Sequence, residues 1–132
     1  MSARFWVFIA AVMGGFAVAA GAIGAHALGD AVSVDSKRIF STGQQYHFLH
    51  ALALLAVGIV LMQSEGRRAL FATWSLQIAA SFFLIGIFCF SGGLYVQVAE
   101  RLVSNAGIVP LGGISFMIGW AAFAVGALGL RS

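Results

Sequence analysis

Residues 42–55, TGQQYHFLHALALL, hold two of the three histidines in this chain, one tyrosine and two glutamines, and then continue into unbroken apolar sequence. His47 and His50 stand three residues apart, so on a helix they share a face, with Tyr46 on the adjoining stripe. In hydrocarbon each unsatisfied polar group costs several kcal/mol, so these side chains need partners. We therefore expect the polar chemistry of the chain to be concentrated here.

This stretch lies in one of four charge-free runs that determine the fold class. The 132-residue chain is 61% hydrophobic and 8% charged, whereas ordinary soluble domains are roughly 25% charged. The apolar runs are 5–29, 39–64, 69–99 and 102–130, each longer than the ~20 residues that span a bilayer core. They are continuous rather than alternating, which disfavours a strand barrel. The sequence predicts a single domain, an all-α membrane bundle of four antiparallel transmembrane helices over about 4–28, 42–63, 69–91 and 110–130.

Two helix boundaries stay open at this point. Asp35 or Ser36 can cap a second helix that begins early, and a start after Thr42-Gly43 is also compatible with the sequence. Ser91-Gly92-Gly93 either ends the third helix or loosens it. Pro110 suits the first position of the fourth helix, because the N–H it lacks would have no partner there.

The first apolar run is expected to be a helix of the fold rather than a signal peptide. Ala25-His26-Ala27 imitates a cleavage site, but the run before it is too long for a typical signal sequence. Trp6 lies near the inner end of this helix, where an indole suits the headgroup boundary.

The basic residues favour both termini in the cytoplasm. With the N-terminus inside, the inner side holds four basic residues and the outer side three, in the direction of the positive-inside rule. These are Arg4, Arg67, Arg68 and Arg131 against Lys37, Arg38 and Arg101. The net charge of +3 comes from these scattered flanking residues. There is no basic stripe, so the expected surroundings are the lipid bilayer and not nucleic acid.

Small residues form a seam on the first helix and another on the last. A seam of this kind lets a second helix approach to close backbone contact. We expect these two helices to pack against one another or against copies of themselves. The seam residues are Ala10, Gly14, Ala17, Gly21 and Gly24 on the first helix, and Gly112, Ser115, Gly119, Ala122, Gly126 and Gly129 on the last.

The histidines are expected to converge in the outer leaflet, because His26 ends the first helix and His47 and His50 lie in the outer part of the second. Imidazole suits zinc, copper or iron, and a pair of histidines suits haem. The metal candidates are therefore His26, His47 and His50. The wider set of candidate ligand-binding residues is His26, Gln44, Gln45, Tyr46, His47, His50 and Tyr95.

Three interpretations of this cluster remain open. The side chains can be hydrogen-bonding struts between helices, they can hold a ligand, or they can line a path for a small solute. The ligand can be a metal, a haem or a quinone, since Tyr46 and His47 beside apolar side chains can hold a ring. The sequence itself requires no particular cofactor.

No constellation for catalysis is present in the sequence. No carboxylate lies within an apolar run, and the metalloprotease, CxxC, GxSxG and phosphate-loop motifs are absent. We therefore expect a protein that is not an enzyme. The two seams favour an interaction protein, such as an accessory subunit of a membrane complex or a homo-oligomer.

Four segments resemble the signatures of a known family. They are residues 21–28 (GAIGAHAL), 42–52 (TGQQYHFLHAL), 91–95 (SGGLY) and 110–113 (PLGG). In this order they are similar to the small YgdD-like inner-membrane proteins, the domain of unknown function 423, which includes the animal transmembrane protein 256. This chain departs from the family pattern at Val109, where a hydroxyl residue is usual, and at Gly93, where the pattern has serine. The resemblance implies a four-helix bacterial inner-membrane protein and implies no activity.

Overall fold

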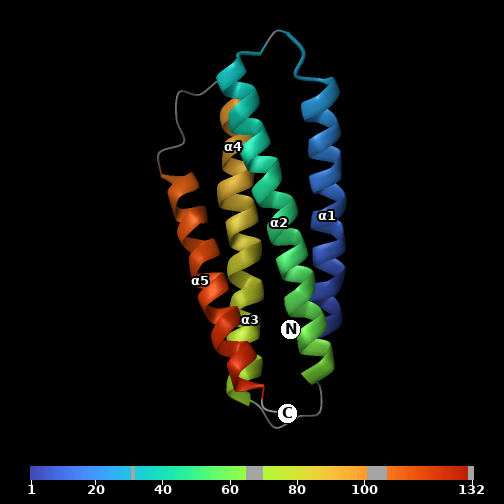
Figure 1. Cartoon of the computed structure of the whole chain (residues 1–132), viewed down its shortest axis with the longest axis vertical. Coiled ribbons are helices and arrows are strands. Elements are labelled where there is room, and N and C mark those ends of the chain that lie inside the picture. The colour runs from blue at the N-terminus through green and yellow to red at the C-terminus, as the bar shows by residue number, and fades with distance from the viewer. Residues whose placement is uncertain (31, 65–69, 101–106, 131–132) are drawn as a thin grey trace.

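The computed structural model describes residues 1–30, 32–64, 70–100 and 107–130. Every element of this part of the chain is a helix, and α3, η1 and α4 follow one another as one rod (Figure 1). Each of the four rods is long and apolar enough to cross a membrane. The predicted class, an all-α membrane protein of four helices, is confirmed. The elements are α1 (Ala3–His26), α2 (Val34–Ser64), α3 (Leu70–Gly86), η1 (Ile87–Gly92), α4 (Gly93–Ala99) and α5 (Ile108–Gly129).

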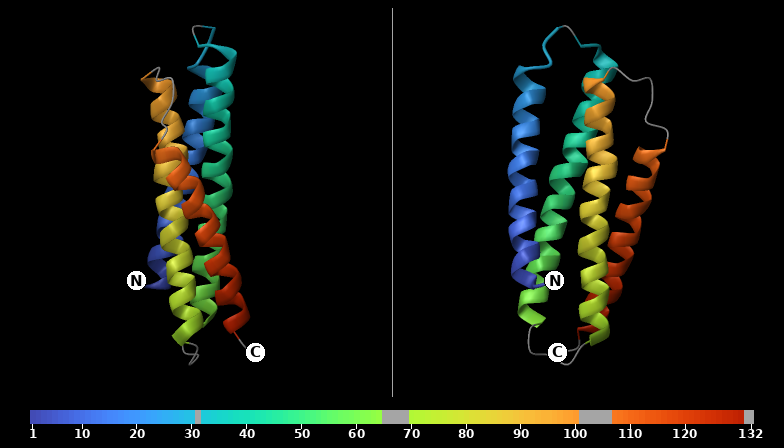
Figure 2. Two further views of the ribbon diagram at one scale, coloured as in Figure 1. Left: turned by 90° about the vertical axis from the view of Figure 1, so that its left-hand side faces the viewer. Right: turned by 180° about the vertical axis from the view of Figure 1, so that it is seen from behind.

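The two central rods are α2 and the α3–η1–α4 rod, and each carries one outer helix. α1 packs along α2, and α5 packs along α3 and η1 (Figures 1 and 2). α1 begins and α5 ends at the same end of the bundle, which we call the terminal end (Figure 1). The stretch 42–55 forms the middle of α2, where Gln44 bonds to α1 and His50 bonds to α5.

The second helix begins at Val34, well before residue 42. Its cap is Ser33 rather than Asp35 or Ser36. The Ser33 hydroxyl accepts a hydrogen bond from the Ser36 backbone N–H at 3.1 Å and donates to the Ser36 hydroxyl at 3.0 Å. This satisfies an N–H of the first turn, which otherwise has no helical partner. Because α2 begins early, the charged residues Asp35, Lys37 and Arg38 lie on its first turns and not in a loop.

The third rod continues to Ala99 instead of ending near residue 91. Ser91-Gly92-Gly93 falls where the backbone changes from the π-helix η1 to the α-helix α4. A π-helix holds more residues per turn, so the rod is loosened at this point without breaking. Pro110 is the third residue of α5, where a missing N–H is equally harmless because the first four lack helical acceptors.

The small residues of α5 pack against α3 and η1. A Cβ atom on Gly119 would lie 2.7 Å from the Phe83 ring, and one on Gly126 would lie 2.9 Å from Leu76. At Gly112 the backbone of Phe90 fills the space instead. Glycine at these positions allows α5 to approach α3 and η1 closely.

The seam on α1 faces α2, so the expected pairing of the first and last helices is wrong. A Cβ on Gly24 would lie 2.9 Å from the Phe40 ring, and one on Gly21 would lie 3.3 Å from the Gln44 amide. Gly14 packs on nothing within 4 Å, because the buried strip of α1 runs beside it through Ala10 and Ala17. Helices joined by a short connection tend to be neighbours. Gly58 of α2 also allows close approach, because a Cβ there would lie 2.8 Å from Val7 of α1. Self-association remains a prediction.

The basic residues Arg67, Arg68, Arg101 and Arg131, on which the orientation partly depends, lie outside the described residues. The cytoplasmic location of the termini therefore remains a prediction from the sequence.

Candidate ligand sites on the second helix

His50 is held by hydrogen bonds at both of its ring nitrogens. Its Nδ1 lies 2.8 Å from the backbone carbonyl oxygen of Tyr46, and a carbonyl only accepts, so Nδ1 carries the proton. The other nitrogen, Nε2, accepts from the indole N–H of Trp120 at 3.1 Å. The ring also stacks on Phe116, with centroids 3.5 Å apart and planes 12° apart. His50 is therefore a neutral strut between α2 and α5 with no lone pair left for a metal.

His47 contacts a different set of neighbours from those of His50. Its Nδ1 lies 3.1 Å from the hydroxyl oxygen of Tyr95 on α4. The ring is only 5% exposed, and its Nε2 completes no hydrogen bond, although the Met13 carbonyl of α1 interacts with the ring. The hydroxyl of Ser91 in η1 is likewise buried without a partner among the described residues.

The three histidines do not converge on a metal site. His26 is exposed at the last turn of α1, while His47 and His50 contact α4 and α5 respectively. His47 and His50 are three residues apart, which is a rotation of about 300° around the helix axis, so their side-chain directions differ by about 60°. This difference is enough for them to contact different helices. No group of three metal-ligating side chains gathers anywhere in the described part of the chain.

The seven predicted site residues thus occupy separate environments. Tyr46 and His50 face α5, His47 and Tyr95 form a contact in the bundle, and Gln44 lies against α1, where its amide donates to the Ala17 carbonyl at 3.4 Å. His26 and Gln45 are exposed.

A groove of about 480 Å³ lies between α2, η1 and α5, on the same side as His50. We call it the α2–α5 groove. Tyr46 is 42% exposed beside it, and its hydroxyl has no hydrogen-bond partner among the described residues. The planes of the Tyr46 and His50 rings are 18° apart, and those of Tyr46 and Phe116 are 29° apart. The groove is lined by Tyr46, Leu49, His50, Phe90, Pro110, Gly113, Ile114, Phe116, Met117 and Trp120.

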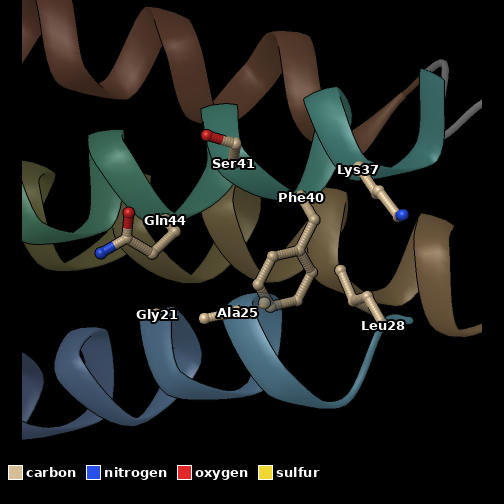
Figure 3. A pocket seen from close by; sticks show the side chains of 8 residues that line it. Gly21, Ala25, Leu28, Lys37, Phe40, Ser41 and Gln44 are labelled. Carbon is tan, nitrogen blue, oxygen red and sulfur yellow. The ribbon is translucent and has the colours of Figure 1, made fainter. Parts of the chain in front are cut away.

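A second cavity, of about 250 Å³, lies between α1 and α2 (Figure 3). Its residues come from the last turns of α1, the residues just after them and the first turns of α2, at the end of the bundle away from the termini (Figure 1). We call it the α1–α2 pocket. Gln44 is the only predicted site residue that lines it. The full lining is Gly21, Gly24, Ala25, Leu28, Lys37, Phe40, Ser41 and Gln44.

The sequence reasoning missed the aromatic side chains that surround His50. Phe116 and Trp120 stand four residues apart on α5, so they share a face, and this spacing was a usable signal. It also missed Lys37, which shares a helical face with Ser41 and Gln44 at intervals of four and three. Lys37 shares this face only because α2 begins at Val34, and a helix that starts after residue 43 would not include it.

A family model described as protein of unknown function DUF423 matches residues 20–113. The UPF0382 inner membrane protein YgdD of Escherichia coli K12 is 34% identical over 131 residues, covering 99% of this chain and 95% of that protein. The UPF0382 membrane protein YwdK of Bacillus subtilis is 31% identical over 125 residues, covering 95% and 97%. A UPF0382 membrane protein of Haemophilus influenzae is 33% identical over 128 residues, covering 96% of each.

No solved structure matches the chain significantly. The family match spans most of the chain, includes residues 42–55, and agrees with four apolar helices. The protein therefore belongs to the DUF423 (UPF0382) family of multi-pass membrane proteins.

Proposed function

We propose that this protein is a non-enzymatic membrane protein that binds a quinone-type, ring-bearing lipid in the α2–α5 groove. The observation that carries the proposal is the Tyr46 hydroxyl. It stands at the edge of an aromatic groove without a hydrogen-bond partner among the described residues. An unpaired hydroxyl beside lipid is costly, and a ligand carbonyl oxygen would satisfy it.

The walls of the groove suit a flat ring. Tyr46 and Trp120 line the groove and are 42% and 44% exposed, so their rings are accessible for offset stacking with a further ring. His50 and Phe116 are buried, and their planes lie within 29° of the plane of Tyr46. The hydrogen bond from Trp120 fixes the His50 ring, so the surface is formed before a ligand arrives. The volume of about 480 Å³ lies within the range of roughly 300–1,000 Å³ that is usual for ligand pockets.

The surroundings of the groove favour a ligand that arrives through the membrane. Leu49, Ile114 and Met117 line it and are exposed on the surface of the bundle. In a helix that spans the bilayer such residues contact lipid. A lipid with a long apolar chain can therefore reach the groove sideways while its ring meets Tyr46.

Metal and haem are the less supported versions of the ligand hypothesis. Both nitrogens of His50 are committed to protein partners. His47 contacts Tyr95 of α4 instead of the groove, and His26 is exposed at the last turn of α1. A quinone needs only stacking and one hydrogen-bond donor, and the groove offers both.

Quenching of tryptophan fluorescence tests the proposal, because Trp120 lines the groove and quinones quench indoles on contact. The purified chain in detergent is titrated with a short-chain ubiquinone analogue. Tyr46→Phe removes the unpaired hydroxyl, and we expect it to weaken binding by about tenfold, the equivalent of ~1.4 kcal/mol. Gly113→Leu fills the groove, where a Cβ meets nothing closer than 3.9 Å, and we expect it to abolish saturable quenching.

Two matched variants are the controls. Tyr95→Phe removes a hydroxyl outside the groove, and Gly15→Leu adds the same side chain on α1, where a Cβ meets nothing within 4 Å. Both should bind like the parent. Equal weakening by Tyr46→Phe and Tyr95→Phe, or saturable quenching that survives Gly113→Leu, would contradict the proposal.

A second candidate function, docking of a membrane-protein partner, is favoured by the free face of α1. Gly14 and Gly15 have nothing within 4 Å of their Cβ positions, and Phe8 and Phe16 nearby are exposed. The seams at Gly119 and Gly126 are filled within the chain, so they are not available to a partner. Loss of a co-purifying subunit or of a dimer in Gly15→Leu supports docking, and an unchanged native mass and subunit composition counts against it.

A further inference from the structure

The α1–α2 pocket combines a cation, two further hydrogen-bond donors and an apolar wall. Lys37, Ser41 and Gln44 line it from one face of α2. Lys37 extends on one side of Phe40, and the polar ends of Ser41 and Gln44 point to the other side (Figure 3). Gln44 uses one amide N–H for a long contact with the Ala17 carbonyl, which leaves the second free. Leu28 and Phe40 supply apolar surface. No carboxylate is among the lining residues, so the Lys37 ammonium is the only charged side-chain group that lines the pocket.

Lys37 is free to pair with a ligand. The neighbouring cation, Arg38, lies 3.5 Å from Asp35, so that carboxylate is engaged elsewhere. Among the residues the structure describes, no carboxylate is within ion-pair distance of the Lys37 ammonium. Asp30 and Glu100, the other described acids at this end, therefore leave Lys37 unpaired.

The shape of the pocket depends on glycines of α1. Gly21 and Gly24 let Gln44 and Phe40 approach the backbone of α1, and a Cβ at Gly24 would collide with Phe40. The cavity of about 250 Å³ exceeds the roughly 30 Å³ that one water molecule occupies. It has room for a headgroup and not only for a solvent molecule.

The position of the pocket selects an amphiphilic ligand. It lies where the charge-free runs 5–29 and 39–64 both reach their first charges, at Asp30 and Arg38. That level of a membrane helix meets lipid headgroups, and lysine side chains reach toward them. Apolar and cationic groups line the same cavity, as the junction between an acyl chain and a phosphate requires.

We propose that the α1–α2 pocket binds the phosphate of an anionic phospholipid from the leaflet at the end of the bundle away from the termini. The flexible, exposed Lys37 side chain turns toward Ser41 and Gln44 to pair with the phosphate, these two residues donate hydrogen bonds to its oxygens, and Phe40 and Leu28 contact the start of the acyl chains. The site is separate from the α2–α5 groove, so either proposal can fail without the other.

Thermal unfolding of the full chain in neutral detergent tests this site. Phosphatidylglycerol, phosphatidylcholine or inorganic phosphate is added in turn, and the rise of Tm with concentration gives an apparent affinity. Phosphatidylglycerol should stabilise the parent more than phosphatidylcholine does, and inorganic phosphate should do little. Stabilisation by inorganic phosphate equal to that by phosphatidylglycerol would overturn the lipid assignment, and no stabilisation by phosphatidylglycerol would overturn the site.

Matched variants separate the pocket from general surface charge. Lys37→Gln should weaken the apparent affinity for phosphatidylglycerol about fivefold, the equivalent of ~1 kcal/mol for one lysine at a membrane surface. Arg38→Gln removes the same charge from a side chain outside the pocket and should leave the affinity close to that of the parent. Ala25→Leu keeps every charge but fills the pocket, and should weaken binding at least as much as Lys37→Gln. Equal effects of Lys37→Gln and Arg38→Gln, or no effect of Ala25→Leu, would overturn the proposal.

Discussion

At the scale of single residues, the two histidines of the stretch 42–55 have different roles. His50 accepts from Trp120 and donates to its own helix, so its tautomer is fixed by its partners. His47 meets the Tyr95 hydroxyl, and its second nitrogen completes no hydrogen bond among the described residues. The same residue type therefore bonds to α5 at one position and contacts α4 and α1 at the other.

The strut role of His50 makes a prediction about substitution. His50→Gln keeps a donor and an acceptor of comparable reach, so we expect it to fold nearly as well as the parent. His50→Leu leaves the Trp120 N–H unsatisfied and should lower the free energy of unfolding by roughly 1–3 kcal/mol. Thermal unfolding in detergent measures both.

Adding Trp120→Phe to His50→Leu removes that orphaned donor and provides the control. The double variant should lose less stability than the sum of the two single changes, because the two side chains share one interaction. Equal stability of His50→Gln and His50→Leu, or strict additivity, would show that the hydrogen bond contributes nothing.

At the scale of the elements, glycine decides how closely α5 approaches the third rod. Phe83 is fully buried, so it has no space to move away from a new methyl group at Gly119. Gly119→Ala should therefore destabilise the bundle by about 1–3 kcal/mol, the usual cost of overpacking. Gly113→Ala, on the same helix but facing the open groove, should be neutral or slightly stabilising, since alanine favours a helix over glycine.

Thermal unfolding of the two alanine variants, compared with the parent in the same detergent, tests this account of the α5 seam. Similar midpoints for Gly119→Ala and Gly113→Ala would mean that α5 does not depend on close approach at Gly119.

The sequence predicted the four membrane-spanning helices, but it did not predict which helices pack against one another. Four charge-free runs longer than a bilayer core leave no other fold class. The pairing of α1 with α2 could not be read from the two seams, because a seam shows that a helix has a close neighbour without showing which one. The end of the third helix was missed for a related reason, since nothing in Ser91-Gly92-Gly93 distinguishes a helix end from a π-helical segment that continues.

The candidate site was predicted in part. The stretch 42–55 does supply Tyr46 and His50 to one cavity and Gln44 to another. The predicted convergence of the three histidines is wrong. His47 and His50 differ by about 60° in direction and contact different helices, and His26 is exposed at the last turn of α1. Phe116 and Trp120 come from a helix some 70 positions away, and only the packing of α5 brings them to His50.

For the whole molecule, the orientation in the membrane is a prediction that rests on charge alone. Because basic residues stay in the cytoplasm, we expect both termini to face that side. Reporter fusions at the C-terminus and in the 65–68 connection should show cytoplasmic activity only. Periplasmic activity from either fusion would reverse the orientation.

The central claim is that the α2–α5 groove holds a ring-bearing lipid, and photocrosslinking in native membranes tests it most directly. A photoreactive quinone analogue is activated on membranes that contain the chain, and the labelled peptides are mapped by mass spectrometry. We expect labels on α2 near Tyr46 and on α5 between Gly113 and Met117. Excess unlabelled quinone should suppress these labels, and Gly113→Leu should abolish them. Labels spread over the lipid-facing surface of α1, or unchanged by Gly113→Leu, would contradict it.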